Sequence, residues 1–406
     1  MLVPYTTETG GAMESENPIA DTTRRILTDL ADPQTINKAG DGWKAPAWAA
    51  LEDAGLTLAW VPENLGGAGA DLADGFAVLR QAGRFAAALP IAETLLAGWL
   101  LSRAGIAAPK GAMTCGPARE GDRPMLSGNG TLSGALRAVP FAKDAEHLAI
   151  VARRDNGGVA VALVDASQLR IAEGTSIGGD PLNGVTLAGA RPAVVKEAPA
   201  GLDEQALLLM GAAVRAMQMA GALETILDLA VAYANERVAF ERPIAKFQAV
   251  QHNLARLAGE VAVAIAAAGS AADAVANAGD WGSPPPLWGR DREGGTHDGP
   301  AIPPPLAPPR KGEGDLSSKR EGDLAVFLEV ASAKIRVGEA ATEGAGIAHQ
   351  VLGAIGFTQE HILHRYTRRL WAWRDDFGSE SAWAVKLGQL VAAKGPDGLW
   401  PMLAER

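Results

Sequence analysis

The stretch between Glu236 and His252 holds the side chains of this sequence best suited to bind an anion together with a flat ring. It reads Glu-Arg-Val-Ala-Phe-Glu-Arg-Pro-Ile-Ala-Lys-Phe-Gln-Ala-Val-Gln-His. Arginines supply planar donors for phosphate, phenylalanines supply faces for an aromatic ring, and glutamines can hydrogen-bond its polar edge. These side chains are Arg237, Phe240, Arg242, Phe247, Gln248 and Gln251. The stretch is a candidate cofactor site; the alternative is a helix hairpin with solvated arginines and core phenylalanines.

Two amphipathic helices must hold this stretch in place. Apolar residues recur at helical spacing before it, between positions 223 and 234, and the same period resumes after it, between positions 250 and 265. Pro243 breaks the backbone hydrogen-bond ladder between them. The sequence therefore predicts two packed helices joined by a functional loop.

The stretch closely resembles the flavin-binding hairpin of the acyl-CoA dehydrogenase family, which usually reads Glu-Arg-x-x-Phe-Gly-Arg-Pro-Ile, then Phe-Gln and Gln-His. Further segments follow in the family's order: Trp60-Val-Pro-Glu-Asn-Leu-Gly-Gly-Ala-Gly69, Gly83-Arg84 with Pro90 and Glu93, and His349-Gln-Val-Leu-Gly-Ala-Ile-Gly-Phe357. The resemblance covers nearly the whole chain. It implies an FAD-dependent dehydrogenase that converts an acyl-CoA thioester to the 2,3-enoyl-CoA, with a carboxylate base and hydride transfer to the flavin.

The resemblance also implies which residues bind the cofactor and how subunits assemble. The assigned residues are Arg237, Phe240, Gln248, Gln350 and Gly353. In the family the hairpin and the second segment contribute to one flavin from different subunits, which implies a homo-oligomer or a hetero-oligomer with a second acyl-CoA dehydrogenase subunit. Electron-transfer flavoprotein is the expected acceptor. Two residues depart from the pattern, because Glu241 and Ala354 stand where the family usually has glycine.

The β region departs further from the family. The strand that meets the flavin in the family has become Gly134-Ala-Leu-Arg-Ala-Val-Pro140, without its usual aromatic and hydroxyl residues. Thr114 remains as the candidate hydroxyl donor to the flavin ring.

The catalytic base is displaced as well. The family's glutamate falls at Phe377, and no carboxylate occupies that position. Asp376 is therefore the candidate base, and Asp375 is the second choice. The other base position known in the family aligns near Gly211, and Glu204, about two helical turns away, is a poor candidate.

These departures leave alternative functions open. The first is a catalytic FAD-dependent acyl-CoA dehydrogenase with Asp376 as base. The second is a non-catalytic or half-site subunit of a hetero-oligomeric acyl-CoA dehydrogenase, which lends its hairpin to a flavin whose base comes from the partner. A third is a flavoprotein of the same fold with other chemistry, such as an oxidase.

Composition narrows the class of protein. With 406 residues, 48% of them apolar and 5% aromatic, we expect a large core of closely approaching, alanine-rich helices. The net charge of −10 without a basic stripe argues against nucleic acid as a partner. The single cysteine, Cys115, excludes a disulfide framework and fits a reducing cytoplasm. The histidines show no metal-ligand spacing, so we predict no metal site. No apolar run approaches the roughly 20 residues of a membrane span.

The expected architecture is mainly α with a central β domain. We predict a mobile N-terminus at 1–17, an N-terminal helical domain at 18–110, a small antiparallel β-barrel-like domain at 111–200 and a C-terminal four-helix bundle at 201–406. Alternating runs such as Val159–Val164 indicate the strands. A Pro- and Gly-rich insertion at 280–323, with Pro-Pro-Pro-Leu repeated at 284 and 303, is predicted to be disordered because it cannot bury enough apolar surface.

Overall fold

The computed structural model describes residues 17–278 and 314–404. Residues 1–16 of the predicted mobile N-terminus and 280–313 of the predicted insertion lie outside the described residues. The remainder of that insertion, residues 314–323, differs from the prediction because it forms the first turns of a long helix. A helix that is already packed in a bundle extends at little cost, since each added residue gains a hydrogen bond without a new nucleation step.

The N-terminal part is helical, as predicted from the periodicity. Its helices are α1 (Pro18–Ala31), α2 (Pro33–Ile36), α3 (Lys44–Asp53), α4 (Leu72–Arg84) and α5 (Ile91–Arg103). Helix α1 begins where the side chain of Asn17 accepts hydrogen bonds from the backbone of Ile19 and Ala20. Helix α5 is buried along most of its length and packs against both β1 and α6. It therefore carries Glu93 into the interior.

Two small sheets form the central β domain. The strands are β1 (Met113–Gly116), β2 (Met125–Leu126), β3 (Leu132–Ser133), β4 (Ala135–Pro140), β5 (His147–Arg154), β6 (Val159–Asp165), β7 (Arg170–Ala172), β8 (Leu182–Thr186) and β9 (Val194–Glu197). One sheet has the order β3-β2-β5-β6-β9 with β1 beside β5, and the other has the order β4-β8-β7. The domain is not purely antiparallel, because β1 and β2 run parallel to β5. The long connections before β5 allow this pairing, which a tight hairpin could not.

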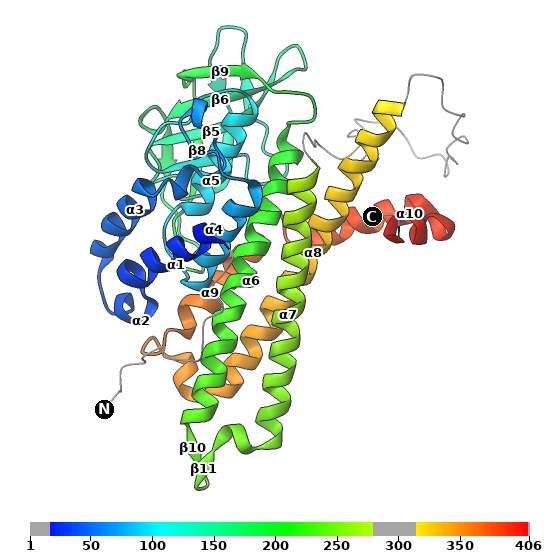
Figure 1. Ribbon diagram of the computed structural model, residues 1–406. Helices are drawn as coiled ribbons and strands as arrows, with labels where there is room; N and C mark the ends of the chain where they lie inside the picture. The colour runs from blue at the N-terminus through cyan, green and yellow to red at the C-terminus, as the bar shows by residue number, and fades with distance from the viewer. Residues whose placement is uncertain (1–16, 279–313, 405–406) are drawn as a thin grey trace.

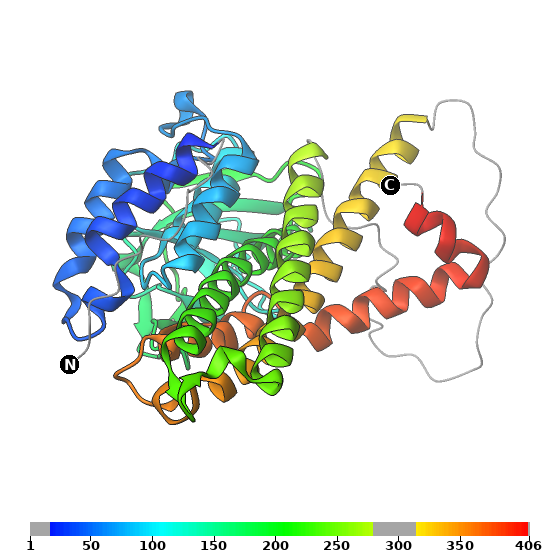
Figure 2. The ribbon, with the colours of Figure 1, turned by 60° about the horizontal axis from the view of Figure 1, so that its bottom comes forward.

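A bundle of long helices forms the C-terminal part, and the predicted fold class is confirmed. Its helices are α6 (Glu204–Glu236), α7 (Gln248–Asn277), α8 (Gly314–Leu352), α9 (Leu363–Asp375) and α10 (Glu380–Ala404). Helices α6, α7 and α8 pack lengthwise against one another, and α8 also contacts α9 and α10. Figure 2 shows α10 projecting away from the rest of the molecule.

Helices α6 and α7 are both long and apolar enough to cross a membrane by length and composition, contrary to the expectation from the sequence. Their alanine content gives a high average hydropathy without a continuous run of large apolar residues. The apolar window of α6 is entirely buried inside the molecule, as in the core helix of a soluble protein, whereas that of α7 is 28% buried.

The end of the bundle shown at the bottom of Figure 1 brings two distant parts of the chain together. The short hairpin of β10 (Val238–Ala239) and β11 (Arg242–Pro243) joins α6 to α7 there through the 3-10 turn η5 (Ile244–Lys246). The end of α8 and the following 3-10 turn η6 (Gly353–Phe357) lie at the same end. The predicted cofactor segments therefore share one end of the bundle.

Candidate functional site

The β10–β11 hairpin presents its ring- and phosphate-binding side chains to solvent. Val238 pairs with Pro243 and Ala239 with Arg242, so the turn between them holds only two residues. Phe240 and Glu241 both take positive φ, +51° and +66°, the left-handed geometry of a tight hairpin turn. The Phe240 side chain is 89% exposed. An apolar ring this exposed is positioned to contact another molecule rather than the core of its own chain.

The other predicted cofactor residues lie nearby, at the same end. Arg237, Gln248 and Gln350 are exposed, and Gly353 takes a φ of +62° where α8 gives way to η6. The guanidinium of Arg242 stacks 4.2 Å from the ring centroid of Phe247. The structure thus brings both segments to one exposed surface without placing either of them in the interior.

Thr114, the remaining predicted cofactor contact, lies elsewhere. It is buried in β1, and its hydroxyl donates to the carbonyl oxygen of Pro140 at 2.7 Å. On β4, Ala138 takes a φ of +49°, and the guanidinium of Arg137 pairs with Asp122 at 2.6 Å. These residues do not fit a flavin ring, because β4 offers neither an aromatic face nor a hydroxyl and the Thr114 hydrogen is already used.

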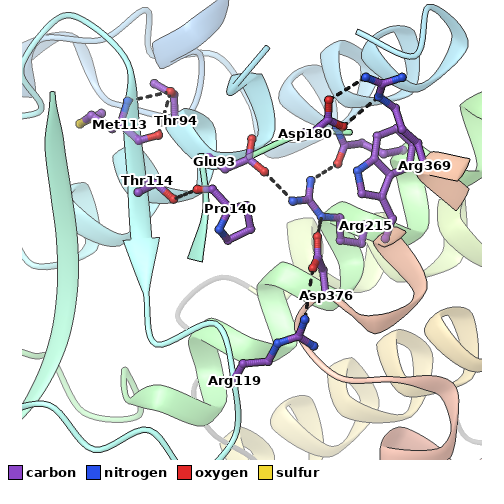
Figure 3. Close-up of polar contacts among 12 residues, drawn as sticks. Glu93, Thr94, Met113, Thr114, Arg119, Pro140, Asp180, Arg215, Arg369 and Asp376 are labelled. Carbon is purple, nitrogen blue, oxygen red and sulfur yellow. Dashed lines mark hydrogen bonds and ion pairs between the residues drawn. The ribbon is translucent and has the colours of Figure 1, made fainter. Parts of the chain in front are cut away.

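Asp376, the candidate base, is held in a buried network of charges (Figure 3). Asp376 is only 7% exposed, and one of its carboxylate oxygens lies 3.1 Å from Nε of Arg215. The other oxygen lies 3.7 Å from a guanidinium nitrogen of Arg119. Asp375, the second choice, is exposed, and its backbone oxygen accepts a hydrogen bond from Arg119. A carboxylate bound by two arginines has its proton-accepting oxygens already engaged.

Arg215 is the centre of this network, and the sequence did not predict its role. Its guanidinium contacts Glu93 at 2.5 Å and the side-chain oxygen of Gln218 at 2.5 Å in addition to Asp376. Burial raises the pKa of Glu93, although Arg215 opposes the change. Burial disfavours the charged Arg215 too, but Glu93 and Asp376 outweigh it and raise the pKa of Arg215. The sequence did contain one indication of this role: Arg215 is a single arginine in a mostly apolar helix, and a buried charge needs a partner.

Phe377 stands where the resemblance places a catalytic glutamate. It lies against Gly211, near which the family's other base position aligns. A Cβ added to Gly211 would stand 2.3 Å from the ring of Phe377, so the ring rests directly on the backbone of α6. Phe377 holds a φ of +54°, and its carbonyl oxygen accepts a hydrogen bond from Trp383 at 3.0 Å. Glu204 is far from this point, because it is buried in a pair with Arg153. An apolar ring therefore fills the space between the two base positions.

An open cavity of about 380 Å³ lies beside the Asp376 network. Its lining consists of Arg119, Glu120, Arg137, Gly378 and Ala382. Arg119 is shared between the cavity and the ion network. Two aromatic rings lie beside Arg215. Its guanidinium carbon is 5.8 Å from the ring centroid of Phe377 and 6.0 Å from that of Trp373.

Comparison of this chain with known proteins finds matches to one protein family. The model of the acyl-CoA dehydrogenase N-terminal domain matches residues 13–113, and that of the C-terminal domain matches residues 204–284. Acyl-CoA dehydrogenase IpdE2 of Mycolicibacterium smegmatis is 27% identical over 256 residues, which cover 62% of this chain and 74% of that protein. Acyl-CoA dehydrogenase FadE34 of Mycobacterium tuberculosis is 28% identical over 364 residues, 87% of this chain but only 43% of FadE34.

The fold agrees with these matches. The crystal structure of the ChsE4-ChsE5 complex from Mycobacterium tuberculosis superposes with a TM-score of 0.73 at 22% identity, covering 94% of this chain and 98% of that one. Two family models, relatives over most of the chain and a shared three-part fold lead to one conclusion. This chain belongs to the acyl-CoA dehydrogenase family.

Proposed function

We propose that this chain is a non-catalytic, half-site subunit of a hetero-oligomeric acyl-CoA dehydrogenase. Its exposed hairpin would bind part of an FAD molecule whose ring is held by a partner subunit. That partner would supply the carboxylate that removes the α-proton of the acyl-CoA. The FAD, when bound, supplies the hydride acceptor for the α,β-dehydrogenation.

The observation that carries this proposal is the contact between Phe377 and Gly211. A base must reach the substrate proton within hydrogen-bond distance, and both positions known to serve in the family carry no carboxylate here. The carboxylate oxygens of the adjacent Asp376 face Arg215 and Arg119 instead of an open space for substrate.

The two halves of the cofactor site support a divided role. At the end of the bundle, Arg237 can donate to phosphate, Phe240 offers a free ring face and Gln248 offers an amide. At β4 the residues do not fit a flavin ring. A subunit that keeps the first half and lacks the second can lend residues to a neighbour's cofactor. The similar ChsE4-ChsE5 structure is a complex of two named proteins, which is consistent with such an assembly.

The visible flavin spectrum tests the proposal. The chain purified alone should retain no flavin and show no bleaching with an acyl-CoA. Co-expressed with the acyl-CoA dehydrogenase subunit that copurifies with it from its own cells, it should yield a flavin-containing complex that bleaches. Arg237→Ala should lower the flavin content of that complex. Arg256→Ala is the matched control, because this exposed arginine of α7 pairs with Glu343 on the bundle surface.

Asp376→Asn separates this function from a catalytic one. In the complex, the variant should bleach at the wild-type rate once its folding has been verified by circular dichroism. If the chain alone binds FAD, bleaches with acyl-CoA and loses bleaching in Asp376→Asn, Asp376 is the base and the chain is a complete enzyme.

A further inference from the structure

One face of α9 carries more positive charge than its surroundings neutralise. His364, Arg365 and Arg368 lie in α9 at the spacing that places residues on the same side of a helix, Arg369 adjoins them, and His361 precedes the helix. Arg369 is neutralised, because it forms two hydrogen bonds with the carboxylate of Asp180, at 2.9 and 2.6 Å. Among the described residues, neither Arg365 nor Arg368 forms a salt bridge.

Arg365 holds a donor that nothing satisfies. Its Nε atom is buried and has no hydrogen-bond partner among the described residues. Burial lowers the pKa of Arg365, and the neighbouring Arg369 lowers it further. A charged donor withdrawn from water without an acceptor is unfavourable, so such a group points to a missing acceptor.

A second unsatisfied donor lies across from the helix. The loop 173–181 is fixed to α9 where Nε of Arg368 donates to the backbone oxygen of Ile177 at 2.7 Å. The hydroxyl of Ser176 in this loop is buried without a partner. A Cβ on Gly178 would stand 3.1 Å from Cγ of Arg369 and 3.3 Å from Oγ of Ser176, which places the Ser176 hydroxyl beside the helix.

His364 lies among the same cations. Its Nδ1 donates to the backbone oxygen of His361 at 2.8 Å, so the neutral ring does not add a donor for an anion. Burial lowers the pKa of His364, and Arg365, Arg368 and Arg369 lower it further. Arg365 and Arg368 lie three residues apart on one side of α9, and the hydrogen bond from Arg368 to Ile177 brings the loop that carries Ser176 to the same side.

We propose that Arg365, Arg368 and the Ser176 hydroxyl form a binding site for a phosphate-type oxyanion. Such an ion has several acceptor oxygens and matches the planar donors of arginine. Inorganic phosphate and the phosphate of a nucleotide such as coenzyme A share this chemistry. The site is remote in sequence from the β10–β11 hairpin and does not depend on the half-site function.

Calorimetric titration of the purified chain with inorganic phosphate, at constant ionic strength, tests the site. Phosphate should bind, while chloride should give no saturable heat. Arg365→Gln and Arg368→Gln should each weaken phosphate binding roughly tenfold, since each removes a charge-assisted contact. Arg154→Gln is the matched control, because the Nε of Arg154 on β5 is also buried without a hydrogen-bond partner among the described residues but lies on the β domain, away from α9 in the sequence. Its phosphate affinity should equal that of the wild type.

A second titration with adenosine 3′,5′-bisphosphate identifies the source of the anion. Binding roughly tenfold tighter than phosphate, with the same loss in both variants, assigns the site to a nucleotide; equal affinity assigns it to free phosphate. The proposal is overturned if neither ligand binds the wild type, or if Arg154→Gln weakens binding as much as Arg368→Gln. Should Arg365→Gln fail to fold, Arg365→Lys and Arg368→Gln carry the test.

Discussion

Arg215 of α6 and Glu93 of α5 form an ion pair whose side chains are both almost wholly withdrawn from water, 3% and 2% exposed. With Asp376 and Arg119 this pair links the N-terminal helices, the bundle and the β domain. The link adds buried charges to the apolar packing that these parts share. Its members therefore depend on one another more strongly than surface charges do.

Removing Arg215 alone should destabilise the fold. We expect Arg215→Met to lower the free energy of unfolding by about 3–5 kcal/mol, because it leaves the buried Glu93 without its counter-charge and Asp376 with Arg119 alone. Urea denaturation followed by circular dichroism measures this. The exposed pair of Arg256 and Glu343 is the control, and Arg256→Met should cost less than about 1 kcal/mol. Adding Glu93→Leu and Asp376→Asn to Arg215→Met should restore much of the loss; if the triple variant is no more stable than Arg215→Met, the network does not act as a unit.

Lys334 should make stability depend on pH. It is fully buried in α8, donates to the backbone oxygen of Trp373 at 2.6 Å, and burial lowers its pKa to about 7. The unfolded chain holds that proton up to about pH 10.4. Between these values the unfolded state binds more protons, so stability should rise with pH from about 7 to about 10. The slope of unfolding free energy against pH should be smaller in Lys334→Met; identical slopes would contradict the lowered pKa.

Glu241 should strain the hairpin turn. A non-glycine residue at a φ of +66° costs about 1 kcal/mol relative to glycine. Glu241→Gly should therefore stabilise the chain by about that amount in thermal unfolding. Glu241→Ala removes the charge but keeps the conformational strain, and it should not share the gain. Equal effects of the two variants would assign the cost to charge instead of conformation.

Helices α4 and α6 should not tolerate side chains where they cross. A Cβ on Gly83 would stand 2.1 Å from the backbone oxygen of Gln218, and one on Gly221 would stand 2.1 Å from that of Arg80. Gly83→Ala and Gly221→Ala should each destabilise the chain by more than about 1 kcal/mol, because backbone must move. Gly259 of α7 has no atom within 4 Å of such a Cβ, so Gly259→Ala should be neutral or stabilising by up to about 1 kcal/mol. Thermal unfolding of the three variants measures these changes in stability; a loss in Gly259→Ala as large as in the other two would contradict the close approach of α4 and α6.

The hairpin and the order of the three parts could be predicted because their signals are local. Arg237, Phe240 and the flanking helical periods lie within one continuous stretch of sequence. The charge network could not be predicted in the same way, since Arg215 meets Glu93 across 122 residues and Asp376 across 161 residues. Nothing near Asp376 in the sequence reveals an arginine that neutralises it. The parallel pairing of β1 with β5 escaped prediction for the same reason, because it depends on which strands meet in space.

The C-terminal end of α7 and the N-terminal end of α8 lie at the end of the bundle opposite the hairpin (Figure 1). Loop-closure entropy grows only slowly with length, so changes in the size of the segment between them cost the bundle little. Chain added between these two helix ends would be attached at the end opposite β10 and β11. This makes the connection a suitable place to graft a fluorescent label or an affinity handle that leaves the subunit contact surface free.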